Sequence, residues 1–104
     1  MWSLHRQALT RGVTPIVPAA VLAEAWRGEV PMARLILGTH VEPLDSSSAR
    51  SAGLMLKRSA GGAAIDATVV VGALRRDDAV VTSDRADLTR LADSVGRRLA
   101  VIDV

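Results

Sequence analysis

Short β-branched runs alternate along this chain with longer segments whose apolar residues recur every three or four positions. The four strand-like runs cover residues 13–17, 41–44, 79–82 and 98–104. Because helical segments separate these runs, the strands are expected to pair in parallel through crossover connections. The alternation therefore predicts an α/β domain with three layers, in which helices cover both faces of a parallel sheet.

The expected helices follow from capping signals and apolar spacing. Asp45 and the three serines at 46–48 supply N-cap oxygens for one helix, and Gly61-Gly62 ends it. The predicted helices cover residues 2–11, 18–28, 32–39, 45–60 and 64–76, with a last one from Ser83 or Asp84 to Gly96. The final strand, 98–104, is almost continuously apolar, which predicts burial on both of its faces.

Length and composition limit the function classes. A chain of 104 residues has room for one domain, and 49% hydrophobic against 23% charged residues is a globular balance. The chain has no cysteine, which excludes thiolate chemistry and favours the cytoplasm. No apolar run is long enough to span a bilayer. A net charge of +2 is too small to indicate nucleic-acid binding by itself, although all the cationic side chains except Lys57 are arginines.

Three acidic residues are expected at the carboxyl edge of the sheet. Glu24 lies in the helix after the first strand-like run, Asp66 in the first turn of its helix, and Asp84 just after the run 79–82. Each has an ordinary interpretation, as a solvated helix residue, a helix-dipole partner and an N-cap respectively. Three carboxylates at one edge repel each other unless a cation compensates, and Mg²⁺ or Mn²⁺ prefers such oxygen ligands. Their convergence therefore predicts a metal site able to activate water against a phosphodiester.

Three segments near the predicted acids are VPAAVLAEAWRG at 17–28, AIDA at 64–67 and VVTSDRADL at 80–88. Together they resemble the PIN-domain family, in particular the VapC-type toxins of bacterial toxin-antitoxin pairs. The resemblance implies a cytoplasmic Mg²⁺- or Mn²⁺-dependent endoribonuclease that cuts RNA and is held inactive by a cognate antitoxin. It matches the metal-binding acids to Glu24, Asp66 and Asp84, an additional acid to Asp87, and a supporting hydroxyl to Thr82. Arg27 and Arg85 are our candidates for RNA phosphate contacts.

The chain departs from this family at its start. PIN domains begin with a central strand that carries an aspartate, followed by a helix, and no strand is predicted here before Val13. A missing central strand would leave unpaired backbone groups and an apolar slot. We expect a shortened form of a longer product, with Met1 an internal start; completion by a strand from another chain and a degenerate relative are the alternatives.

The absence of the family's first strand and its aspartate also determines the activity that we expect. With one of four acids lost, weak or absent nuclease activity and self-association are expected. The alternative function is a catalytically inactive PIN-like module that binds an antitoxin or pairs with itself.

Overall fold

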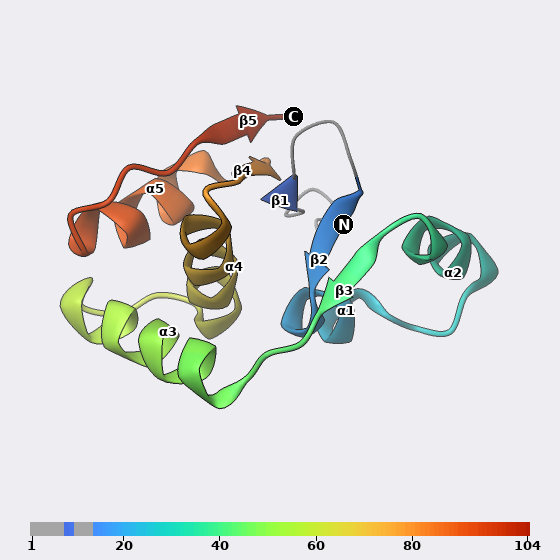
Figure 1. The fold of residues 1–104 in the computed structure, drawn as a ribbon, viewed down its shortest axis with the longest axis horizontal. Coiled ribbons are helices and arrows are strands. Elements are labelled where there is room, and N and C mark those ends of the chain that lie inside the picture. Colours follow the sequence, from blue (N-terminus) through green and yellow to red (C-terminus); the bar gives the residue numbers. More distant parts are fainter. Residues whose placement is uncertain (1–7, 10–13) are drawn as a thin grey trace.

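The computed structural model describes residues 8–9 and 14–104, which form a mixed α/β domain around one five-stranded sheet (Figure 1). The strands are β1 (Ala8–Leu9), β2 (Pro15–Pro18), β3 (His40–Glu42), β4 (Ala79–Thr82) and β5 (Val101–Asp103). The helices are α1 (Ala19–Ala25), α2 (Val30–Leu37), α3 (Ser46–Arg58), α4 (Ala64–Arg76) and α5 (Arg85–Ser94). The strand order across the sheet is β3-β2-β1-β4-β5.

The structure at the centre of the sheet overturns three sequence predictions. Ala8 and Leu9 form β1 rather than part of a helix over 2–11, whose other residues all lie outside the described ones. Their strand fills the central position and pairs antiparallel with β2 on one side and β4 on the other. The sheet is therefore mixed, not wholly parallel, and the predicted empty central slot is occupied. The helical spacing of residues 2–11 is overridden by the pairing of β1 with a strand on each side. Such long-range pairing leaves no signal in the local sequence.

The topology still sends the main strands in one direction. β2 and β4 are both antiparallel to β1, so they are parallel to each other, and β3 and β5 run parallel to them. The carboxyl ends of all four strands therefore lie at one edge of the sheet, which is the edge used by ligands in open α/β folds.

Helix α4 forms the centre of the core. It packs across β1, β2 and β4, and both α3 and α5 pack on it (Figure 1). Most of its residues from Asp66 to Ala73 are buried, as expected for a helix enclosed on several sides. On β4, Val80 and Thr82 are fully buried while the alternate positions are half-buried, so α4 covers one face of this strand more completely than the other.

The predicted burial of the last strand is wrong. β5 is shorter than the run 98–104, and its pattern is half-buried at Val101 and exposed at Ile102 and Asp103. The reason is its position at the edge of the sheet, where it pairs with β4 alone. An apolar run does not distinguish an edge strand from a central one. Within the described residues, no helix is long and apolar enough to cross a membrane.

The start of α3 confirms the predicted cap at Asp45. Its Oδ1 accepts a hydrogen bond from the Ser48 N–H at 2.7 Å. This backbone hydrogen bond is the largest cause that lowers the pKa of the exposed Asp45 carboxyl, followed by a side-chain hydrogen bond from Ser48, with a smaller contribution from the charge of Arg75. Folding therefore favours the ionised form of this side chain.

We expect Asp45→Asn to make the stability of the protein less dependent on pH. The lowered folded-state pKa means that the ionised cap stabilises fully above the unfolded-state pKa and loses this contribution as pH falls through the folded-state value. Urea denaturation of both proteins from neutral to acidic pH should show a deficit for Asp45→Asn at pH 7 that shrinks on acidification. A constant difference across this range would contradict the assignment.

Candidate functional site

The predicted acids Glu24 and Asp66 are brought to the carboxyl edge by two helices in contact. Glu24 lies in α1, which begins directly after β2, and its side chain is half-buried. Asp66 lies in the first turn of α4, which packs against α1, and only 5% of it is exposed. A short turn joins α4 to β4, so the helix runs back along that strand and begins near its carboxyl end. A carboxylate this deeply buried is unusual, because desolvation penalises the charge.

Asp84 and Thr82 form a second part of the edge, at the end of β4. Asp84 occupies the N-cap position of α5, but its carboxylate makes no capping hydrogen bond there. The fully buried Thr82 instead accepts a hydrogen bond from the Asp84 N–H through Oγ1 at 2.9 Å. The ordinary interpretation of Asp84 as a side-chain cap is therefore wrong, and Thr82 fixes the backbone of the acid as a supporting residue would. Asp87 follows in the first turn of α5 and is exposed.

These acids do not form a preassembled metal centre. Among residues 8–9 and 14–104, no three histidine or acidic side chains are grouped closely enough to hold an ion. The topology places Glu24, Asp66 and Asp84 at one edge without closing them into a common ligand set. Their oxygen donors suit Mg²⁺ or Mn²⁺ chemically, and the three carboxylates would have to draw closer together to share an ion.

The two predicted phosphate-binding arginines differ in their surroundings. Arg85 donates from Nε to both Asp103 carboxylate oxygens, at 3.1 and 2.8 Å, and from Nη2 to the Val101 carbonyl. It is therefore engaged with the β5 edge. Arg27 is exposed and donates to the carbonyl of the neighbouring Trp26 at 2.7 Å, and no ion pair within the described chain compensates its charge.

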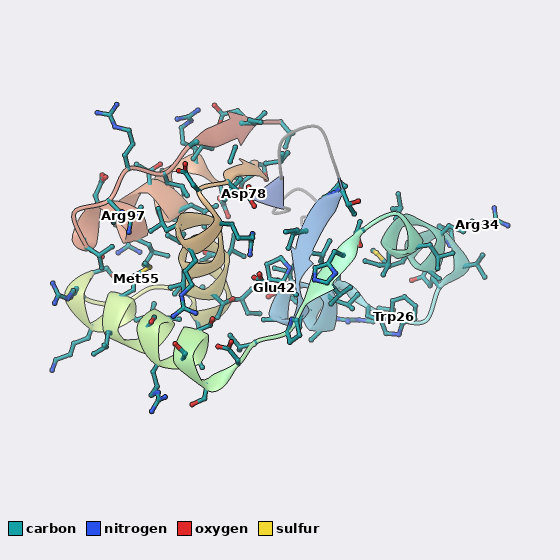
Figure 2. All side chains as sticks on the ribbon, in the orientation of Figure 1. Trp26, Arg34, Glu42, Met55, Asp78 and Arg97 are labelled. Atoms are coloured by element: carbon teal, nitrogen blue, oxygen red, sulfur yellow. The ribbon has the colours of Figure 1, made fainter. Side chains whose placement is uncertain are left out.

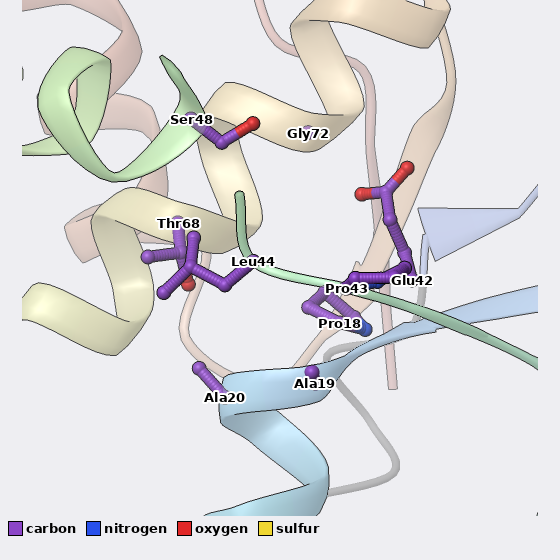
Figure 3. A pocket seen from close by; sticks show the side chains of 9 residues that line it. All are labelled: Pro18, Ala19, Ala20, Glu42, Pro43, Leu44, Ser48, Thr68 and Gly72. Carbon is purple, nitrogen blue, oxygen red and sulfur yellow. The ribbon is translucent and has the colours of Figure 1, made fainter. Parts of the chain in front are cut away.

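A small cavity opens beside the edge, where β2 and β3 end (Figure 3). Its volume is about 10 Å³, room for about one water molecule. The lining residues come from the ends of β2 and β3 and from α1, α3 and α4; they are Pro18, Ala19, Ala20, Glu42, Pro43, Leu44, Ser48, Thr68 and Gly72. The cavity is too small for a nucleotide, but it connects the start of α1 with the start of α3.

An ion-pair network borders this cavity and was not predicted from the sequence. Arg76 donates from Nη1 to Glu42 at 2.5 Å and from Nε to Asp78 at 2.8 Å. Gly72 gives the Glu42 carboxylate room, since a Cβ at this position would lie 2.9 Å from Glu42 Oε1. The network joins the end of β3 to α4 and to the turn before β4; Figure 2 labels Glu42 and Asp78 at its two ends.

A second unpredicted cluster joins α3 to α4. Arg75 donates from Nη1 to Ser48 Oγ at 2.6 Å, and from Nη2 to Ser47 Oγ at 3.0 Å and Ser51 Oγ at 3.2 Å. The serines were interpreted only as cap residues, because their distance of 24 to 28 positions from Arg75 gives no local signal.

Comparison with known proteins supplies no relative. Neither the family models, nor the curated proteins, nor the solved structures contain a match to this chain.

Proposed function

We propose that this chain is a PIN-like, VapC-type ribonuclease with weak Mg²⁺- or Mn²⁺-dependent activity, acting through Glu24, Asp66 and Asp84. The observation that carries the proposal is the burial of Asp66 in the first turn of α4, at the edge where Glu24 and Asp84 also lie. Buried titratable groups concentrate at functional sites, which supports a role for Asp66 in binding a cation.

The residues of the edge have distinct roles in this proposal. A divalent ion would supply a Lewis acid for the phosphoryl oxygen and a more acidic bound water. The carboxylates of Glu24, Asp66 and Asp84 would hold it, with the exposed Asp87 close in sequence to Asp84 as an outer ligand. Thr82 keeps the Asp84 backbone fixed through its 2.9 Å hydrogen bond, and Arg27 offers a charge to RNA phosphates.

The partners follow from the same proposal. The RNA phosphodiester is the substrate, a cognate antitoxin is the inhibitor, and the cytoplasm is the compartment in which both occur. Self-association is proposed as well, because β3 and β5 are edge strands that each have one paired side.

One observation favours the second candidate, an inactive PIN-like module that binds an antitoxin or itself. In the described ranges no three acidic or histidine side chains form a ready cation site. An enzyme that must first draw its ligands together binds metal weakly and turns over slowly. Both candidates therefore agree on low activity, and they differ in whether a metal binds at all.

Metal binding and RNA cleavage separate the two candidates. The proposed nuclease should show a rise in melting temperature with Mn²⁺ and slow, EDTA-sensitive cleavage of a labelled RNA. In Asp66→Asn, both the Mn²⁺ response and the cleavage should fall to background, because an amide loses the charge that attracts the cation. Asp93→Asn removes one carboxylate outside the site, in α5, and should leave both readouts unchanged. No Mn²⁺ response in the unsubstituted protein would favour the inactive module.

A further inference from the structure

The serine-bound guanidinium of Arg75 has unused hydrogen-bond donors of two kinds. Three of its five N–H groups are directed at Ser47, Ser48 and Ser51, and the remaining two are uncommitted in the described chain. Each serine oxygen accepts from the guanidinium, and the Ser48 side chain also forms a hydrogen bond that lowers the pKa of the Asp45 carboxyl. The two uncommitted N–H groups of Arg75, beside the Ser47 and Ser51 hydroxyls, can therefore donate to an added acceptor.

Among the described residues, the charge of Arg75 also has no ion-pair partner. The described ion pairs involve Arg76 and Arg85, not Arg75. Asp45 is the acidic group whose pKa it helps to lower, but the cap hydrogen bond to the Ser48 N–H uses Asp45 Oδ1. An exposed arginine held by neutral oxygens keeps its full charge for a ligand, since hydroxyls orient the guanidinium without neutralising it.

The position of the Arg75–serine cluster beside the cavity indicates which ligand it can bind. Ser48 belongs both to the cluster and to the lining of the small cavity, whose other walls include Pro18 and Ala19 at the start of α1. Figure 3 shows Ser48 and Thr68 on one side of this hollow and Ala19 and Ala20 on the other. A single RNA strand that passes along the carboxyl edge of the sheet can therefore continue over the cavity and reach Arg75.

From this geometry we propose that Arg75, with Ser47, Ser48 and Ser51, binds a backbone phosphate of single-stranded RNA beside the small cavity, nine residues along α4 from Asp66. The inference rests on the proposed function for the identity of the ligand. The guanidinium donates to a non-bridging phosphate oxygen through one of its uncommitted N–H groups, and the serine hydroxyls rotate to donate to the phosphate. The contact fixes the position of the RNA and carries no sequence preference.

The test is RNA binding without cleavage. Fluorescence anisotropy with a labelled single-stranded RNA, in EDTA, should give a Kd about five- to tenfold higher for Arg75→Gln than for the unsubstituted protein. The slope of log K against log salt should fall by about 0.7 for the loss of one phosphate contact. The combined Ser47→Ala/Ser48→Ala variant should weaken binding by about twofold and keep the salt slope, because it removes donors and no charge.

The matched control is Arg97→Gln. Arg97 is an exposed arginine in the segment between α5 and β5, away from the cavity, and is labelled in Figure 2. The substitution Arg97→Gln removes the same charge as Arg75→Gln and should change the Kd for RNA by about twofold or less. Equal effects of the two arginine substitutions, or no RNA binding by the unsubstituted protein, would overturn the site.

The same experiments distinguish a failure of the nuclease proposal from a failure of the phosphate site. If Arg75→Gln weakens RNA binding selectively while the protein neither binds Mn²⁺ nor cleaves, the phosphate site stands and the catalytic proposal fails. Circular dichroism melting of each variant confirms that the binding differences do not come from unfolding.

Discussion

Ala8→Pro should lower the free energy of unfolding by about 3 kcal/mol or more, a large part of the total for a domain of this size. Ala8 pairs with Ile16 of β2 and with Val80 of β4. Every N–H group of a central strand points to one of its two neighbours, so a proline in β1 removes a ladder hydrogen bond whichever side the N–H faces. The proline ring also restricts φ to a value unlike that of extended antiparallel strands.

The same substitution elsewhere provides the control. Ser46 is the first residue of α3, where a proline is tolerated because the N–H has no partner within the helix. The preceding Asp45 is already extended, with φ −87° and ψ 172°, as a residue before proline should be. Urea denaturation should show a much lower midpoint for Ala8→Pro and a nearly unchanged one for Ser46→Pro. Equal midpoints for Ala8→Pro and the unsubstituted protein would mean that β1 does not hold the sheet together.

The sequence predicts elements well where their signals are local. Helix α4 has the predicted bounds, Ala64–Arg76, and β4 has the predicted Ala79–Thr82, because apolar spacing and the charged turn between them define both. The strand at Ala8–Leu9 was missed because two residues carry no periodicity and their pairing partners lie at Ile16 and Val80. Its central place depends on tertiary pairing, which overrides local propensity.

For the candidate site, the sequence predicts where each acid lies along the chain, but not how the side chains are arranged. Chain topology and the position of each acid after a strand or at a helix start place Glu24, Asp66 and Asp84 at one edge. Whether the side chains close around a cation depends on side-chain packing, which spacing does not encode. The serines around Arg75 were invisible for a related reason, since their partner is held on a different helix.

Arg76→Met is expected to reduce stability by about 2–4 kcal/mol, because it leaves two acidic side chains without their cation. The Asp78 side chain is only 8% exposed, while that of Glu42 is 34% exposed, which keeps the expected loss below that of a fully buried pair. Methionine replaces much of the apolar stem of arginine, so the loss reports on charge rather than on a cavity. Chemical denaturation near neutral pH measures it.

Arg85→Met provides the matched comparison, since it breaks an ion pair whose side chains are 53% and 58% exposed. Its effect should stay below about 1 kcal/mol, because water screens both charges.

A further variant separates charge burial from packing: Arg76→Met combined with Glu42→Leu and Asp78→Leu removes the whole network. Arg76 Nη2 is buried without a hydrogen-bond partner in the described chain, so the network is incompletely satisfied. The triple variant should therefore recover much of the stability lost in Arg76→Met. A triple variant no more stable than Arg76→Met alone would show that the arginine acts through its packing and not through its charge.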